Sequence, residues 1–374
     1  MTRMFRYLLL FYALSCGIGF AQTDTAQRNI DLSGDFRFRI EQDWRSQKSD
    51  GTWRDDRTRM RYRFRFGVDY TYNPSIKFGF RIRTGLQNKQ QDPQLTLGDL
   101  SDWGTLPLGF EKIYFDFNKK GWRIGLGKNI FPFQKQNELF WSDHVYPEGV
   151  FLCYKPKKGA FPLDLRLGHF ILNANGKGLD TDGYLQAIQL TGKAFKNRLA
   201  LMAGYFYFNQ MPDIPDGFAT RYYNYGIAHF ATGVHVTPKL KFEADYWQNV
   251  LNMQQSSQVV NYMADQRSGY AGAIAYGTLK EKGNWKFKLT YAYIERFAIV
   301  DFLAQNDWVR WDYGSYGSPD GRLSNYQGIE AMVGYALGHK MVLKAKYYWT
   351  EQLLSQGTFL ENGQRFRIDI DISL

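Results

Sequence analysis

Hydrophobic and polar residues alternate along most of this chain, from Leu32 to the last residue. Between residues 57 and 70, arginine occupies the odd positions from 57 to 65, and apolar or aromatic residues occupy the even positions from 60 to 70. The end of the chain repeats the pattern, because Phe366, Ile368, Ile370 and Ile372 are each separated by one charged residue. Successive side chains of a β-strand point to opposite faces, so the pattern predicts strands with one apolar and one polar face.

The alternation predicts an all-β fold, an antiparallel transmembrane β-barrel of about sixteen strands, and an even number is usual for bacterial barrels. Short joints such as 72–75 and 337–340 alternate with long polar connections such as 88–109 and 297–324. Short turns on one rim and long loops on the other are typical of such barrels, and the short rim should be periplasmic because both chain ends lie there. The predicted strands span residues 32–44, 57–72, 75–87, 110–118, 121–128, 149–156, 162–172, 184–195, 198–208, 222–236, 240–248, 270–279, 285–296, 325–336, 341–350 and 364–374.

A soluble β-sandwich would also alternate, but its outward face would be polar and its strands shorter. Many of the predicted strands reach the roughly 9–11 residues that a tilted strand needs to cross a bilayer. Aromatic residues make up 17% of the chain, and several stand near strand ends, as in the girdles of membrane barrels. The membrane barrel is therefore favoured over the sandwich. The aromatic residues near strand ends are Tyr70, Tyr72, Trp122, Trp285 and Trp349.

The first residues resemble a secretory signal peptide. Arg3 and Arg6 form a basic segment, residues 7–20 are largely apolar, and Gly19 and Ala21 supply small residues before a cleavage site. We therefore expect residues 1–21 to be removed and residues 22–374 to form an outer-membrane barrel. A lipoprotein signal around Cys16 is the alternative. After cleavage Cys153 is the only cysteine, which excludes an internal disulfide.

Basic residues gather on one predicted face. A lipid-facing arginine at mid-bilayer costs roughly 2–4 kcal/mol, so this row is expected to face the lumen. Neighbouring arginines would repel, and the candidates to balance them are Asp35, Glu41 and Asp69, acidic loop residues, or anions in transit. Two interpretations stay open: a solvated wall of locally paired charges, or a screen that attracts anions. The predicted pore-lining basic residues are Arg37, Arg39, Arg57, Arg59, Arg61, Arg63, Arg65, Lys77, Arg81, Arg83, Arg365 and Arg367.

The third long loop, residues 129–148, is rich in Phe and Trp and therefore poorly suited to extend into water. We expect it to fold into the lumen as a constriction. Folding inward would carry Glu138, Asp143 and Glu148 toward the arginines. The residues predicted to form this constriction are Glu138, Trp141, Asp143, Pro147, Glu148 and Gly149.

Several motifs resemble a family of porins from Gram-negative outer membranes, and the wider pattern resembles sixteen-stranded porins in general. The specific part of the match covers roughly the first 120 residues after the signal and includes the segments 34–39, 79–85, 127–128, 132–133 and 147–149. Leu374 in place of a terminal Phe, and Ser142 in place of an acidic residue, depart from the family pattern. The resemblance implies a porin fold, passive transport and a homotrimer, without naming a substrate.

Signals for other chemistry are weak. Ser142, Asp143 and His144 are adjacent, and neighbouring residues cannot converge into a catalytic triad. No Cys/His spacing suggests zinc, and the Asn- and Asp-rich segment 173–182 has the wrong spacing for calcium. We therefore expect no enzyme activity, cofactor or metal. A nucleic-acid site is disfavoured because the basic face would be enclosed.

The sequence thus predicts an outer-membrane channel for passive diffusion of small hydrophilic solutes, with an arginine-lined wall that favours anions. Its partners would be outer-membrane lipid and small, mostly anionic solutes. Two alternatives remain: a substrate-specific channel for anionic oligosaccharides or phosphate-like solutes, and a barrel occluded by its loops with a role in adhesion or assembly.

Overall fold

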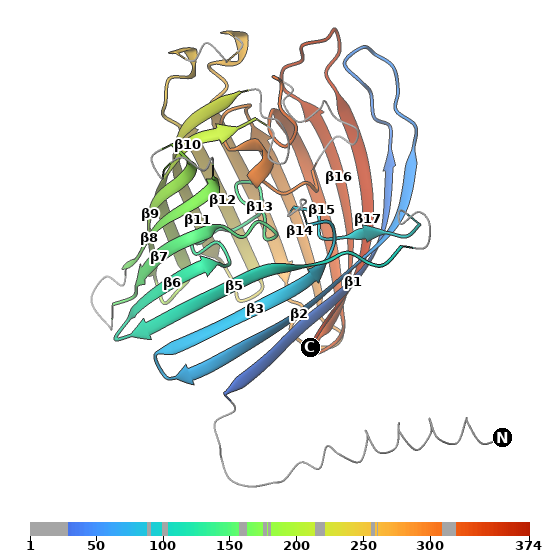
Figure 1. The fold of residues 1–374 in the computed structure, drawn as a ribbon. Helices are drawn as coiled ribbons and strands as arrows, with labels where there is room; N and C mark the ends of the chain where they lie inside the picture. Colours follow the sequence, from blue (N-terminus) through green and yellow to red (C-terminus); the bar gives the residue numbers. More distant parts are fainter. Residues whose placement is uncertain are drawn as a thin grey trace, which may run out of the picture.

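The computed structural model describes residues 29–87, 91–98, 104–156, 163–174, 178, 181–213, 221–255, 259, 261–308 and 319–374. This part of the chain forms a closed antiparallel barrel of sixteen strands with one further short strand (Figure 1), which confirms the predicted fold class. The expected signal peptide lies outside the described residues. The barrel strands are β1 (Ile30–Trp44), β2 (Arg57–Asn73), β3 (Ile76–Thr84), β5 (Leu108–Lys119), β6 (Trp122–Lys128), β7 (Glu148–Tyr154), β8 (Leu163–Asn173), β9 (Gly183–Ala194), β10 (Leu199–Pro212), β11 (Tyr222–His235), β12 (Leu240–Asn249), β13 (Ser268–Gly277), β14 (Trp285–Ile294), β15 (Tyr326–Gly338), β16 (Met341–Gln352) and β17 (Asn362–Ser373).

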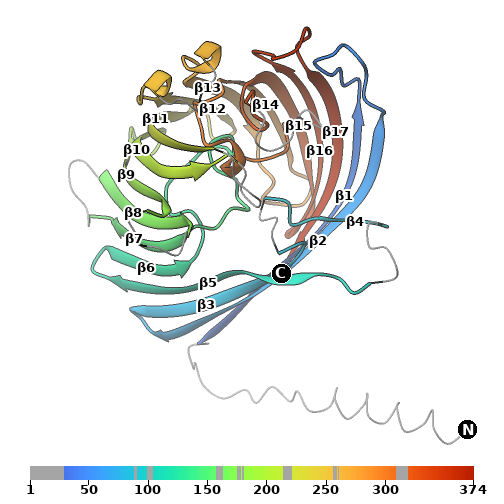
Figure 2. The same ribbon diagram turned by 45° about the horizontal axis from the view of Figure 1, so that its top comes forward.

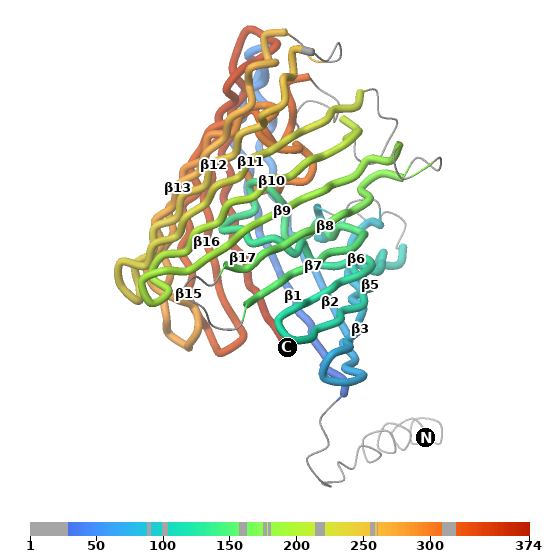
Figure 3. Tube along the Cα trace, turned by 90° about the vertical axis from the view of Figure 1, so that its left-hand side faces the viewer, coloured from blue at the N-terminus to red at the C-terminus, as the bar shows by residue number. Residues whose placement is uncertain are grey.

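Each strand pairs with its neighbours in sequence, and β1 also pairs with β17, which closes the barrel. Short turns join the strands at the rim where β1 begins and β17 ends, and the long loops extend from the opposite rim (Figure 1). From the side, the strands run obliquely around the wall (Figure 3), as closure of a sheet into a barrel requires. Three short 3-10 helices lie in the described parts of the long loops, at Met253–Gln255, Asn261–Met263 and Asp301–Leu303.

The observed strand ends differ from the predicted ones by a few residues. The third strand ends at Thr84 rather than at residue 87, because Gly85 turns the chain with a φ of 114°. The strand predicted at 198–208 continues to Pro212 past a bulge. The additional strand β4 (Leu95–Thr96) was not predicted. It pairs with β2 at Arg61 and Tyr62, where β3 has already ended, and so covers an otherwise open strand edge.

The polarity of the barrel is the reverse of that of a soluble protein. On β2 the side chains of Met60 and Phe64 are 48% and 41% exposed, whereas Arg61 and Arg63 are 5% and 3% exposed. Because the two sets alternate along one strand, the apolar set forms the outer surface and the arginines face the interior. An apolar outer surface is the arrangement expected of a transmembrane barrel. Within the described residues, the structure contains no helix with the length and apolar character needed to cross a membrane.

Candidate functional site

The twelve basic residues singled out in the sequence form one continuous inner surface, which we call the basic wall. It extends over β17, β1, β2 and β3, four consecutive strands of the barrel. The strand register places Arg39 opposite Arg61 and Arg37 opposite Arg63, so the arginines of β1 and β2 lie side by side. The basic wall comprises Arg37, Arg39, Arg57, Arg59, Arg61, Arg63, Arg65, Lys77, Arg81, Arg83, Arg365 and Arg367.

Opposite charges face each other along the closing seam between β1 and β17. In the order of the chain, β1 presents acid, base, base, acid and acid on its inner face, and β17 presents base, base, acid and acid. Because the strands are antiparallel, four consecutive inner positions are paired with a residue of opposite charge. We call this set the seam ladder. Its pairs are Arg37–Asp371 at 2.5 Å, Arg39–Asp369 at 2.6 Å, Arg367–Glu41 at 2.5 Å and Arg365–Asp43 at 2.5 Å.

The remaining basic residues are also paired. Asp35 contacts both Arg63 and Arg65, at 2.6 and 2.7 Å, and Glu111 on β5 contacts Arg81 at 2.5 Å. Arg61 reaches Asp92 in the second long loop at 2.5 Å. The other pairs are Arg57–Asp43, Arg59–Glu41, Lys77–Asp69 and Arg83–Glu111.

The arginines are therefore balanced mostly by carboxylates of the wall itself. Asp35, Glu41 and Asp69 are among the partners that the sequence suggested. Asp43, Asp92, Glu111, Asp307, Asp369 and Asp371 were missed. Within the described residues, nine carboxylates contact the twelve members of the basic wall, which leaves an excess of three positive charges before Lys344, a further partner of Asp371, is included. The geometry thus favours locally paired charges over an open arginine screen.

The third long loop packs inside the barrel against the wall opposite the arginines (Figure 2). Trp141 is fully buried, and its ring stacks on Phe131 with centroids 4.2 Å apart. Phe133 and Phe140 contact Phe206 of β10 edge to face. The aromatic content of the loop is explained by this contact, because it replaces water with apolar side chains on the inner face of β8–β12.

The acidic residues of the third loop do not reach the basic wall, contrary to expectation. Asp143 contacts Lys135 at 2.5 Å, and Glu138 accepts a hydrogen bond from the backbone N–H of Asp143. Glu148 and Gly149 belong to β7 rather than to a constriction. Since Phe151 of β7 faces inward, Glu148 points outward, where its 60% exposed side chain pairs with Lys128.

Uncharged groups of the third loop contact the basic wall instead. The Tyr146 hydroxyl accepts a hydrogen bond from Arg81, and the His144 Nε2 lies 3.4 Å from an Arg63 guanidinium nitrogen. Burial, together with the charges of Arg63 and Arg65, lowers the pKa of His144 well below its ordinary value. The histidine is therefore neutral at pH 7 and adds no positive charge to the wall.

The seventh long loop, residues 295–325, supplies the acid that the third loop does not. Asp307 contacts Arg367 directly and Arg39 at 3.9 Å. Burial alone would raise the pKa of Asp307, but Arg367 and Arg39 hold it well below its ordinary value. Backbone hydrogen bonds join this loop to the third loop, from Ser142 to Leu303 and from Gln305 to Glu138, at 2.8 and 3.0 Å. The two loops thus form one inner body, which sequence reasoning did not find.

The adjacent residues Ser142, Asp143 and His144 are not arranged for catalysis. Asp143 contacts Lys135, His144 faces Arg63, and Ser142 accepts a hydrogen bond from the backbone N–H of His144. A nucleophile activated by a base needs the two side chains in contact with each other. Across the described residues, no group of three or more His, Cys, Asp and Glu side chains could hold a metal ion.

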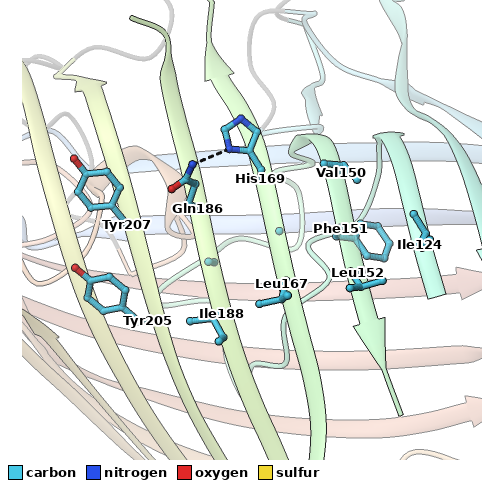
Figure 4. A pocket seen from close by; sticks show the side chains of 12 residues that line it. Ile124, Val150, Phe151, Leu152, Leu167, His169, Gln186, Ile188, Tyr205 and Tyr207 are labelled. Carbon is cyan, nitrogen blue, oxygen red and sulfur yellow. Dashed lines mark hydrogen bonds between the residues drawn. The ribbon is translucent and has the colours of Figure 1, made fainter. Parts of the chain in front are cut away.

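A hollow of about 640 Å³ lies on the outer surface, across β6 to β10 (Figure 4). Its lining is largely apolar, and its polar members are His169 and Gln186, whose side chains are 3.3 Å apart. Tyr205 and Tyr207 complete it on β10. The hollow therefore faces away from the lumen.

Comparison with solved structures shows the sixteen-stranded porin fold. OprB of Pseudomonas putida matches with a TM-score of 0.56 and 14% identity, over 92% of this chain and 94% of that one. A triple mutant of the Rhodopseudomonas blastica porin matches with a TM-score of 0.55 and 12% identity, over 92% and 100%. Salmonella typhi OmpF in complex with daunomycin matches with a TM-score of 0.54 and 12% identity, over 92% and 97%. No protein-family model and no curated protein matches the chain.

Proposed function

We propose that this chain, which has the porin fold, is an outer-membrane channel through which small hydrophilic solutes diffuse passively. The observation that carries the proposal is the reversed polarity of the wall, because Met60 and Phe64 are exposed on the outside while Arg61 and Arg63 are buried inside. A polar interior within an apolar outer band is what a channel for water-soluble molecules requires. The charged inner surface stabilises solute and ions in transit and contributes nothing to lipid contact.

A weak preference for anions is the finer part of the proposal. It is supported by the excess of three positive charges on the basic wall, to which the neutral His144 adds none. Paired charges attract ions less than open ones, so the preference should be modest. It depends on the basic wall lying at the narrowest part of the lumen, since only charges at a constriction govern selectivity.

Permeation through purified protein in liposomes tests both parts. Vesicles should swell in small neutral sugars, and the reversal potential in a KCl gradient should indicate preference for chloride. The variant Asp307→Asn removes the acid that contacts Arg367 and Arg39, so it should shift the reversal potential further toward anions. Asp265→Asn changes a carboxylate in the sixth long loop, away from the basic wall, and should leave the potential unchanged.

Two outcomes would contradict the proposal in different ways. Cation preference would remove the role of the basic wall while leaving the channel in place. Absence of swelling would point to a barrel that its inner loops occlude, with a role in adhesion or assembly. The buried core that the third and seventh loops form against β8–β14 is the observation that keeps this alternative open.

We further propose export after cleavage behind Ala21 and assembly as a homotrimer, as the resemblance to sixteen-stranded porins implies. N-terminal sequencing of protein recovered from outer membranes should begin at Gln22. Mass measurement of the intact complex in detergent should give three copies of the processed chain. A mass of one copy would contradict the assembly alone.

A further inference from the structure

A second set of cations lies on the lumen side of β14 and β16, beside the basic wall. Lys286 and Lys288 belong to β14, and Lys344 and Lys346 to β16. On β14 the flanking residues Trp285, Phe287 and Leu289 are exposed on the outer surface, at 52%, 47% and 53%. Alternation along β14 therefore turns Lys286 and Lys288 inward, and the strand register places Lys344 and Lys346 on the same face. Lys286 and Lys344 lie toward the short-turn rim, from which β14 and β16 begin, and Lys288 and Lys346 lie nearer the middle of the wall.

The strand register arranges these lysines as a four-cornered frame. Lys286 and Lys344 both stand opposite Gly334 of β15, and Lys288 and Lys346 both stand opposite Met332. Two strand spacings separate the pairs across the sheet by roughly 10 Å, and two residues of rise separate them along each strand by roughly 7 Å. Gly334 places no side chain between Lys286 and Lys344, and a Cβ there would lie 2.8 Å from Leu279.

The lysine frame is only partly balanced. Lys288 contacts Glu243, which Lys241 also contacts, at 2.7 and 2.5 Å. Lys344 shares Asp371 with Arg37, and Lys346 is 3.8 Å from Glu330. Lys286 has no carboxylate within ion-pair distance among the described residues. A set of inward lysines that share their carboxylates, with one member unpaired, has capacity to bind a further negative charge.

Between the lysine frame and the inner loops the structure contains a cavity of about 390 Å³. All four lysines line it, so their ammonium groups face one partly open space on the lumen side of β14–β16. The opposite side is formed by the inner loops, with Lys135, Asn137, Glu138 and Asp143 from the third and Gln305 and Asp307 from the seventh. With Glu330 of β15, the described residues of the lining include five lysines and four carboxylates, an excess of one positive charge. The neutral amides and the three carboxylates on that side can exchange hydrogen bonds with hydroxyl groups, but the carboxylates repel a second anionic group.

We propose that this cavity is a binding site for a small hydroxylated anion that carries a single carboxylate or phosphate group. The lysine frame holds the charged group, and Asn137, Glu138 and Gln305 bind the hydroxyl groups at the other end. The inference rests on the proposed channel function and deepens it, because it assigns a substrate class to a lumen site that adjoins the basic wall. A neutral sugar lacks the charge that the frame binds, and a dianion with a charge at each end would be repelled by Glu138, Asp143 and Asp307.

Calorimetric titration of the purified barrel in detergent with potassium gluconate tests the site without requiring transport. Gluconate should bind, and sorbitol, its neutral counterpart, should not. Lys286→Gln should weaken gluconate binding at least tenfold, and it breaks no ion pair, so the fold is retained. Lys282→Gln, in the exposed turn before β14, is the matched control and should bind as the wild type does.

Conductance in planar bilayers separates this proposal from the channel proposal. If the barrel conducts KCl but gluconate neither binds nor saturates the current, the site is wrong and the channel stands. Gluconate binding that survives both Lys286→Gln and Lys344→Gln would also overturn the site. Binding that these variants abolish, in a barrel that does not conduct, would support the site and contradict the channel.

Discussion

Arg39 on β1 and Asp369 on β17 are joined by two parallel hydrogen bonds, of 2.6 and 2.9 Å, across the seam where the barrel closes. Both side chains are almost fully buried, and the other pairs of the seam ladder flank them. A shift of β17 by two residues would preserve the inner and outer faces. It would, however, place Arg39 opposite Arg367 in one direction, or Glu41 opposite Asp369 in the other. The seam ladder therefore selects one register of closure.

Asp369→Asn should destabilise the barrel strongly, because it removes the charge that Arg39 contacts at 2.6 Å and, among the described carboxylates, leaves only Asp307, at 3.9 Å, near this buried guanidinium. Breaking one partner of a buried ion pair costs about 3–5 kcal/mol. The free energy of unfolding in urea, measured in lipid vesicles, checks this expectation. The exposed pair Lys128–Glu148 is the control, and Glu148→Gln should cost less than about 1 kcal/mol.

The swapped variant, Arg39→Asp with Asp369→Arg, tests the seam ladder as a pair. It should recover most of the stability lost by either single change, since the charges again oppose each other. Equal stability of Asp369→Asn and the wild type would mean that the pair does not fix the closure.

Replacement of an outer apolar residue tests which face contacts lipid. Phe64→Arg, near the middle of β2, should cost about 2–4 kcal/mol of unfolding free energy in a bilayer. Thr58→Arg lies on the same face of β2 near the long-loop rim and should cost about 0–1 kcal/mol. Costs that do not depend on position along the strand would contradict a lipid-facing outer surface.

His144 should make the folded barrel less stable in mild acid. Its pKa is lowered in the folded state by burial and by Arg63, so only the unfolded chain takes up the proton below a pH of about 6.5. Stability from this residue is complete above that pH and is lost as the pH falls. Between pH 7.5 and 5.5 the loss should be about 1.4 kcal/mol.

The variant His144→Gln isolates this contribution, because other titrating groups remain the same. Its unfolding free energy should fall by about 1.4 kcal/mol less than that of the wild type over the same pH range. His235→Gln changes an exposed histidine at the end of β11 and should follow the wild type. Identical pH curves for all three proteins would exclude the buried neutral state.

Trp141→Ala should release the third loop from the wall. Removal of a fully buried tryptophan costs about 3–5 kcal/mol, and the indole N–H also donates to the Val145 carbonyl at 2.8 Å. Faster proteolysis within residues 129–147 and noisier open-channel current should follow. Trp53→Ala removes a 60% exposed tryptophan from the first long loop and should change neither measurement.

Much of the wall could be predicted, because period-two alternation determines both the existence of a strand and the direction of its side chains. Strand ends and β4 could not, since they depend on where neighbouring strands stop. The error at Glu148 has the same origin: once β7 begins there, the side chain points outward. The opposing charges of β1 and β17 were visible in the sequence, but they become meaningful only when the register is known.

The inner loops were predicted in part. Aromatic content identified the third loop, whereas the seventh was treated as polar. The apolar run at 297–304 could have identified it, since Phe297, Ile299 and Val300 are buried against the strands. The partner of Arg367 could not be found by spacing, because Asp307 reaches it through a long loop rather than along a strand.

The backbone bonds between Ser142 and Leu303, and between Gln305 and Glu138, have a consequence for biogenesis. Two segments more than 150 residues apart complete each other, so a nascent chain that stops before the seventh loop leaves the third with exposed aromatic rings and unmet amide partners. Packing of the two inner loops inside the barrel is therefore a late step of folding, because it requires the carboxyl-terminal third of the polypeptide.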